Sequence, residues 1–495
     1  MLFNSIQFLF FFPIVTLIYF LLPHKWRWLH LLVASCVFYM AFIPVYILIL
    51  VFTIVIDYIA GILIENAVGK KRKWFLTMSI IANVGVLCVF KYYNFFVNNI
   101  DELLKSFNIN THPIPLLNII LPLGLSFHTF QAMSYTIEVY RGNQKAERHF
   151  GIYALYVMFY PQLVAGPIER PQNLLHQFRE EHRPEPNNIT EGLRLMLWGM
   201  FKKVIIADRL AILTVPVFNN PHNYPGISLL IATIMFSFQI FCDFSGYSDI
   251  ALGSAKVMGF TLMKNFNWPY VSRSMSEFWK RWHISLSTWF KDYLYISLGG
   301  NRVSVPRWYF NLFFVFLVSG FWHGANWTFI AWGALHGFYL VFAIVTQNTG
   351  TRLSSAIGLN NNSWVHKVGH AVITFGLVAF AWIFFRANTI ADACFIIRKI
   401  PSAFNDLLVT IHTHRLGLWN IWAIKGVRSP QYLVISFGLI CFIQLLAIKK
   451  VRYKLISVFK RMPFVVRLFV YYLVALVIIL SFIDTAPTSF IYFQF

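Results

Sequence analysis

The sequence predicts an all-α membrane protein that crosses the bilayer many times, and its composition is the first reason. Of its 495 residues, 58% are hydrophobic, 18% are aromatic and only 12% are charged. A soluble chain usually carries about 25% charged residues, so this chain is not expected to form a water-facing globule. At about 20 residues per crossing, it can supply on the order of ten transmembrane helices. The same composition excludes disordered, fibrous and disulfide-scaffold proteins.

A series of long apolar stretches is the second reason. Each is expected to form a helix, and they fall near 7–22, 28–43, 45–64, 75–97, 116–140, 150–166, 195–218, 227–244, 309–346, 369–385, 431–448 and 468–483. The first stretch lacks a basic flank and a small-residue cleavage pattern. It is therefore expected to stay in the membrane and not to be removed as a signal peptide.

The placement of basic residues is the third reason. Lys25 and Arg27 follow the first stretch, residues 70–73 read KKRK, and the segment 141–148 is basic again. Because cytoplasmic loops are enriched in Lys and Arg, this alternation predicts an N-terminus outside the cell and basic loops inside, through residue 148. The net charge of +22 is then a feature of membrane topology, and no nucleic-acid partner is expected.

Two segments depart from simple spanning helices. The run FYPQLVAGPIERP (159–171) contains three prolines and a glycine, which predicts a broken or re-entrant helix that is buried in protein or lines a cavity. The run SEFWKRWHISLSTWFKDYLYI (276–296) places aromatic and apolar residues at helical spacing, with Lys280 and Lys291 off that stripe. This pattern predicts one Trp-rich amphipathic helix at an interface or cavity rim, ending at LGGNR.

The strongest candidate for chemistry is His323, in the run SGFWHGANWTFIAWGALHG (319–337). An ionisable side chain in an apolar, Trp-rich segment is costly and is read as functional by default. Desolvation favours the neutral imidazole that a general base needs. The alternative is a buried histidine that only hydrogen-bonds a backbone carbonyl between helices.

Two further histidines are candidate partners of His323. His336 follows it by thirteen residues, so on one continuous helix the two side chains would face about 220° apart, although a break at Gly324 or Gly333 could alter this. His283 lies on the separate amphipathic segment, which could bring it to His323, and it is therefore the preferred second member. Its alternative is an interfacial histidine among Trp and Lys neighbours.

Acidic and hydroxyl residues cluster in FCDFSGYSDIALG (241–253), directly after an apolar helix. Asp243 and Asp249 must be paired or face water at that depth. They could orient a histidine, bind a substrate hydroxyl, or pair with Arg and Lys of the block that follows. The sequence contains no G-x-S-x-G elbow, P-loop, H-E-x-x-H or C-x-x-C motif, so no bound metal or cofactor is expected.

In combination, these motifs resemble the membrane-bound O-acyltransferase family, in its bacterial alginate O-acetyltransferase branch. The matching pieces are LPLGLSFHTFQAMSYTIEVYRG (121–142), 159–171, CDFSGYSDIALG (242–253), the segment 265–302 with its RWHISLSTWF and LGGNR, 319–337, FFRANTIADA (384–393) and FIYFQF (490–495). The resemblance implies a single domain over 1–495, with N-terminal helices at 1–148, a catalytic core at 149–346 and C-terminal helices at 347–495. It also implies a ring of about 10–12 transmembrane helices, with re-entrant and interfacial helices around a central tunnel.

The resemblance also implies site residues. The family's invariant histidine corresponds to His323 and its second recurrent histidine to His283, while His336 is a third candidate. The motif positions expected to contact substrate are Asp243, Tyr247, Asp249, Trp322 and Asn326.

The implied activity is acyl transfer. An acetyl group would move from acetyl-CoA or another thioester, with an acyl carrier protein as an alternative donor, and the basic cytoplasmic face would attract such an anionic donor. The acceptor would be a cell-surface polysaccharide, such as an alginate-like exopolysaccharide or peptidoglycan, reached through an extracytoplasmic acetyltransferase partner. The expected location is the bacterial cytoplasmic (inner) membrane, in contact with lipid.

Two other classes of function remain open from the sequence. A transporter or polysaccharide flippase could use His323 as a proton relay, although the inverted repeats typical of such proteins are not visible. A scaffold subunit that only anchors an extracytoplasmic enzyme is the other. A scaffold predicts that His323→Ala has no effect while deletion of the protein does.

Overall fold

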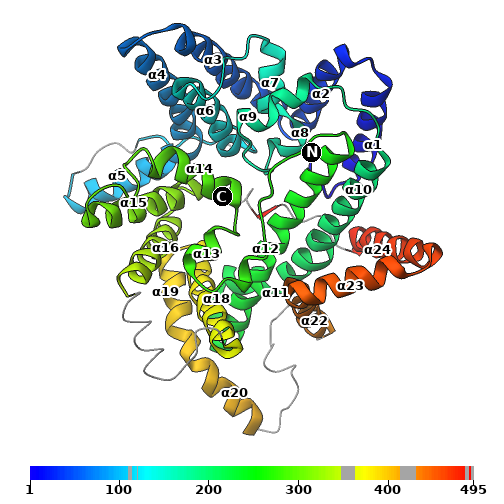
Figure 1. Ribbon diagram of the computed structural model, residues 1–495. Coiled ribbons are helices and arrows are strands. Elements are labelled where there is room, and N and C mark those ends of the chain that lie inside the picture. Colours follow the sequence, from blue (N-terminus) through cyan, green and yellow to red (C-terminus); the bar gives the residue numbers. More distant parts are fainter. Residues whose placement is uncertain (110–113, 120, 347–362, 413–430, 485–489, 492–495) are drawn as a thin grey trace.

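The computed structural model describes residues 1–109, 114–119, 121–346, 363–412, 431–484 and 490–491, and every regular element in these ranges is a helix. Within this part of the chain, six helices are long and apolar enough to cross a membrane, or seven if the bent pair at 434–447 and 449–461 is one span. The prediction of an all-α, multi-pass membrane protein is therefore confirmed. Figure 1 shows the helices arranged around a centre that contains α12, α13 and α14.

The N-terminal helices form one side of the molecule, drawn in blue and cyan in Figure 1. Their bounds are α1 Ile6–Leu21, α2 His24–Met40, α3 Ile47–Asn66, α4 Lys70–Leu87, η2 Cys88–Tyr92, α5 Tyr93–Ser106 and α6 Leu125–Arg141. A buried carboxylate, Asp57 on α3, accepts hydrogen bonds from Ser79 (2.6 Å) and Asn83 (2.8 and 2.9 Å) on α4. Polar side chains that satisfy one another in this way hold apolar helices together inside a membrane.

The segment after α6 is broken, as its prolines predict. It consists of the short helices α7 Phe150–Met158, α8 Tyr160–Leu163, α9 Pro171–Leu174 and η3 His176–Arg179. The non-helical stretch between Val164 and Ile168 is buried in the protein, which is where irregular backbone is tolerated at membrane depth.

The next four elements run into the centre: α10 Pro186–Met200, the π-helical turn η4 Phe201–Ala207, α11 Asp208–Asn219 and α12 Gly226–Val257. Helix α12 is 32 residues long, and 78% of its most apolar window is buried inside the protein. Neighbouring helices therefore pack around α12. The acidic motif 241–253 lies in its C-terminal half.

The prediction of one amphipathic helix over 276–296 is wrong. The segment forms α13 Met275–Trp279, α14 Ile284–Trp289 and the π turn η7 Phe290–Tyr295, and His283 between them adopts a left-handed backbone with φ +43°. Hydrogen bonds to the neighbouring non-helical segment stabilise the break. Ile284 N–H donates to the Asn265 carbonyl and Asn267 N–H donates to the Arg281 carbonyl, each at 2.9 Å. Trp282 and Phe278 are only 1% exposed, so the segment belongs to the protein core.

The long apolar run 309–346 forms two helices, α15 Val305–His323 and α16 Trp327–Val345, joined by a tight turn. The remaining helices are α18 Trp364–Arg386, α19 Ile390–Lys399, α20 Ala403–His412, α22 Gln431–Ala447, α23 Lys449–Arg461 and α24 Phe464–Asp484. After them, Phe490 and Ile491 are buried at the centre of the molecule. Residues 492–495 of the FIYFQF motif lie outside the described residues.

Candidate active site

His323 is the last residue of α15, at a turn between two closely packed helices. The chain leaves the helix at Gly324, whose backbone is extended (φ −165°, ψ 151°), and Asn326 caps α16 by accepting a hydrogen bond from the Thr328 N–H at 2.9 Å. Helices α15 and α16 touch through glycine, since a Cβ at Gly320 would lie 3.0 Å from the Gly333 Cα. The sequence thus places His323 where a helix must end inside the protein.

Aromatic rings surround the His323 imidazole. The ring centroid lies 4.9 Å from that of Trp322, 5.0 Å from that of Trp332 and 5.4 Å from that of Phe385. His323 itself is only 5% exposed. An imidazole in such surroundings is poorly solvated, which favours its neutral form and leaves a nitrogen lone pair available as a base.

His283 is brought to the same centre by the break between α13 and α14. Its imidazole packs between Phe244 (4.6 Å between ring centroids) and Phe127 (6.0 Å), and the residue is fully buried. Phe127 in turn lies 5.5 Å from Trp322, whose indole centroid lies 4.9 Å from that of the His323 ring. The structure therefore brings together the two histidines that the sequence analysis ranked first.

His336 is also near, because the chain breaks at Gly324, one of the two glycines at which the sequence analysis allowed a break. Helix α16 therefore folds back along α15, and Trp332 lies between the two histidines, 5.0 Å from His323 and 4.8 Å from His336. Neither ring nitrogen of His336 has a hydrogen-bond partner among the described residues. His336 extends the histidine–aromatic cluster (His283, His323, His336 and the rings between them) but is separated from His323 by an indole.

The acidic motif of α12 is ion-paired. Asp243 lies 2.5 Å from the Lys203 ammonium, and Asp249 lies 2.7 Å from that of Lys202. These lysines belong to the preceding turn η4, and not to the basic block after the motif, which is where the sequence analysis looked for cations. Among the roles left open for these carboxylates, pairing is the one that the structure displays. Tyr247 packs against Phe490, 4.8 Å away.

Phe490 and Ile491, near the C-terminus, contact the acidic motif of α12. The Ile491 N–H donates to the second carboxylate oxygen of Asp243 at 2.8 Å, and Phe490 also lies 5.5 Å from Phe244, the ring that contacts His283. The carboxylate thus joins η4, α12 and the end of the chain beside the histidine–aromatic cluster.

Trp322 and Asn326 have different surroundings. Trp322 stacks on Phe130 at 5.1 Å, and its indole Nε1 has no hydrogen-bond partner among the described residues. Asn326 uses both ends of its side chain for structure, since it caps α16 and donates to the Asn388 carbonyl at 3.2 Å. Of the two, Trp322 has a donor still available for a ligand.

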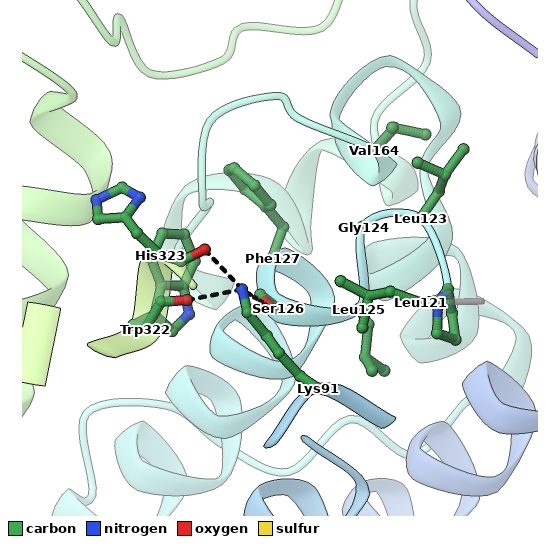
Figure 2. A pocket seen from close by; sticks show the side chains of 11 residues that line it. Lys91, Leu121, Leu123, Gly124, Leu125, Ser126, Phe127, Val164, Trp322 and His323 are labelled. Carbon is green, nitrogen blue, oxygen red and sulfur yellow. Dashed lines mark hydrogen bonds between the residues drawn. The ribbon is translucent and has the colours of Figure 1, made fainter. Parts of the chain in front are cut away.

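A narrow pocket opens beside these residues on the backbone side of His323. Its interior volume is only about 40 Å³, and it is partly open to solvent. Figure 2 shows its lining, which consists of Lys91, residues 121–127, Val164, Trp322 and His323. The His323 imidazole projects away from Lys91, whereas the backbone carbonyls of Trp322 and His323 face it (Figure 2).

Lys91 is the residue that the sequence analysis missed. It is a single lysine within the apolar stretch 75–97, and an ionisable residue at membrane depth is a functional candidate by the rule that selected His323. Within the described residues, no group of three or more His, Cys, Asp or Glu side chains could hold a metal ion.

Comparison with known proteins identifies relatives of this arrangement. The model of the membrane-bound O-acyltransferase family matches residues 144–387. The probable alginate O-acetylase of Pseudomonas aeruginosa is 42% identical over 443 residues, which is 88% of this chain and 81% of that protein. The peptidoglycan O-acetyltransferase of Helicobacter pylori is 37% identical, over 79% of this chain and 78% of that protein.

A third relative is more distant. The teichoic acid D-alanyltransferase of Streptococcus thermophilus is 30% identical over 290 residues, which is 53% of this chain and 68% of that protein. Together with the family match and the buried histidines, these similarities show that the chain belongs to the membrane-bound O-acyltransferase family and is an acyltransferase.

Proposed function

We propose that the protein is an O-acetyltransferase that moves an acetyl group from a cytoplasmic thioester toward a cell-surface polysaccharide, in the bacterial inner membrane. The relatives named as O-acetyl enzymes are 37–42% identical over most of the chain, whereas the D-alanyl enzyme is 30% identical over about half. This difference supports acetyl over D-alanyl as the transferred group. Acetyl-CoA or an acylated carrier protein would supply the group, and an extracytoplasmic acetyltransferase would pass it to the polymer.

The observation that carries the proposal is that His323 and His283, from separate helical segments, are buried in one aromatic cluster in which Phe127 and Trp322 connect them. In the proposed reaction, His323 accepts the proton of an acceptor hydroxyl while the hydroxyl oxygen attacks the thioester carbonyl carbon. The new C–O ester bond forms, the C–S bond breaks, and the proton on His323 passes to the departing thiolate. His283 assists from the facing segment by orienting or stabilising the protonated imidazole.

The negative charge that develops on the carbonyl oxygen needs hydrogen-bond donors. The Trp322 indole Nε1 lies next to His323 and has no hydrogen-bond partner among the described residues. We assign it as a candidate donor. Gly320, by contrast, is committed to the contact between α15 and α16, so its backbone N–H is a poor candidate for that role.

The test combines two readouts at matched membrane abundance: thiol release from an acetyl thioester by the purified protein in vesicles, and O-acetyl content of surface polysaccharide in cells. His323→Ala should lower both by about 100-fold or more, since general-base catalysis contributes about 10²–10⁴-fold. His283→Asn is the second variant, because Asn tolerates a left-handed backbone while it lacks an imidazole. Full activity of His323→Ala would refute the catalytic role of His323 and would favour a scaffold or transporter function.

A further inference from the structure

The end of α15 presents an unusual set of hydrogen bonds. The last four carbonyls of an α-helix have no partner within the helix. Helix α15 ends without a glycine in the left-handed conformation, because Gly324 is extended. Instead, the carbonyl of Phe321 accepts from the Tyr92 hydroxyl (3.0 Å), and those of Trp322 and His323 accept from the Lys91 ammonium (2.8 and 2.9 Å). Figure 2 shows the two lysine bonds.

Both donors come from one short turn of the chain. Lys91 and Tyr92 are the last two residues of η2, a π-helical turn between α4 and α5. On a regular helix, consecutive side chains diverge by about 100°, whereas here both reach the same helix end. The Tyr92 ring also stacks on that of Phe321, 4.3 Å away and tilted by 17°. Single π turns within helices are frequent at functional sites.

A positive charge on Lys91 is favourable at the C-terminus of α15. A helix C-terminus carries a partial negative charge, so a cation there is favourable, and a charged donor makes a stronger hydrogen bond than a neutral one. The ammonium has three protons: two point at the carbonyls of Trp322 and His323, and the Ser126 hydroxyl lies 3.5 Å away. The geometry thus commits Lys91 to the helix end.

From this geometry we infer that Lys91 and Tyr92 are positioning residues, which hold the last turn of α15 and thereby aim the His323 imidazole. Neither is a catalytic residue, because their polar atoms bond the backbone of α15. The His323 imidazole projects away from Lys91 (Figure 2). The inference rests on the proposed function, in which His323 is the base. Displacement of a catalytic group by about 1 Å can lower a rate by about 100-fold, so a fixed helix end has a direct kinetic consequence.

The test measures kcat and KM for thiol release from an acetyl thioester by the purified protein in vesicles. Lys91→Met should lower kcat by about 10- to 100-fold and leave KM within about 2-fold, because only the aim of the base is lost. Lys91→Arg keeps a cation and should recover most of kcat. Tyr92→Phe keeps the ring stack but not the bond to Phe321, and kcat should fall by about 3- to 10-fold. Lys105→Met, at an exposed lysine of α5, is the matched control for loss of charge.

Several outcomes would overturn the inference without touching the proposed function. Wild-type kcat in Lys91→Met, beside an inactive His323→Ala, would refute positioning and leave the catalytic histidine in place. A raised KM with unchanged kcat would show that Lys91 binds substrate. If Lys91→Met does not reach the membrane, Tyr92→Phe tests the inference in its place. Wild-type kcat in Tyr92→Phe would then refute the positioning role. An active His323→Ala is the separate result that refutes the function itself.

Discussion

Two buried polar clusters lie close together in this protein, and they satisfy their polar groups in opposite ways. The ion-paired cluster consists of Lys202 and Lys203 of η4 with the carboxylates of Asp208, Asp243 and Asp249, at distances of 2.5–2.8 Å. The histidine–aromatic cluster places its imidazoles 4.6–6.0 Å from the centroids of neighbouring rings. The C-terminal Phe490 and Ile491 contact both neighbourhoods.

This difference separates structural from chemical use of ionisable residues in a membrane protein. A buried carboxylate or ammonium must be ion-paired or hydrogen-bonded, and it is then committed to that partner. An imidazole can be buried in its neutral form at lower cost, so it keeps the capacity to take up a proton during a reaction. Both sequence motifs looked functional because ionisable residues are rare in apolar segments, yet only one cluster retains this capacity.

The largest expected effect comes from removing a cation from the ion-paired cluster, which tests whether that cluster is structural. Lys203→Met leaves Asp208 and Asp243 buried without their ammonium, which we expect to cost about 3–5 kcal/mol of folding stability. The amount of folded protein in the membrane should fall sharply, as measured by thermal unfolding of the purified protein and by membrane abundance. This loss is larger than any stability change expected at the histidines.

The matched control is Lys256→Met, at an exposed lysine of α12 paired with Glu191, where an exposed pair contributes little. Adding Asp243→Asn to Lys203→Met should restore part of the stability by removing one uncompensated charge. If Lys203→Met unfolds at the wild-type temperature, the ion-paired cluster is not the structural element described here.

A second change tests the backbone that supports His323. Gly320→Ala drives a Cβ into the Phe329 carbonyl oxygen of α16, and the Gly333 Cα and N lie 3.0 and 3.1 Å from it. Overpacking of this kind costs about 1–3 kcal/mol, offset by up to about 1 kcal/mol because Ala favours a helix more than Gly does. We expect a net loss of thermal stability and a larger loss of acetyl transfer, since the two helices must separate beside the base.

Gly376→Ala on α18 is the control, because no atom lies within 4 Å of the added Cβ. It should be neutral or slightly stabilising. Equal thermal stability and equal acetyl transfer in the two alanine variants would show that the contact between α15 and α16 does not constrain the site.

The smallest expected effect is at the cap of α16. Asn326→Ala removes the hydrogen bond to the Thr328 N–H and should cost about 1 kcal/mol, as helix caps typically do. Thiol release should stay within about 5-fold of wild type when measured on equal amounts of folded protein, because a loss of about 1 kcal/mol in stability leaves the site formed. Near-complete loss of activity in folded Asn326→Ala protein would instead indicate that Asn326 contacts substrate.

The sequence predicted the general character of the site better than its geometry. His323 was selected because it interrupts an apolar, Trp-rich run, and His283 because it lies on a separate segment that could reach it; in the structure, Phe127 and Trp322 connect the two. The pairing of Asp243 and Asp249 with lysines of η4 was missed, since nothing in local spacing joins residues about forty positions apart along two helices. The wrong prediction over 276–296 has a similar cause: the helical spacing is real, but hydrogen bonds to the backbone carbonyls of Asn265 and Arg281 stabilise a break at His283.

The sequence by itself determined what depends on local composition: an all-α membrane protein, a broken segment at 159–171 set by its prolines, and a histidine in an apolar turn. Only the tertiary structure decided which groups meet there. Lys91 and Tyr92 reach the end of α15 across about 230 positions of chain, because helix ends inside a protein must find donors wherever packing supplies them. Hydropathy records how far each segment prefers lipid, and it carries no information about the partner that will satisfy the last carbonyls of a helix.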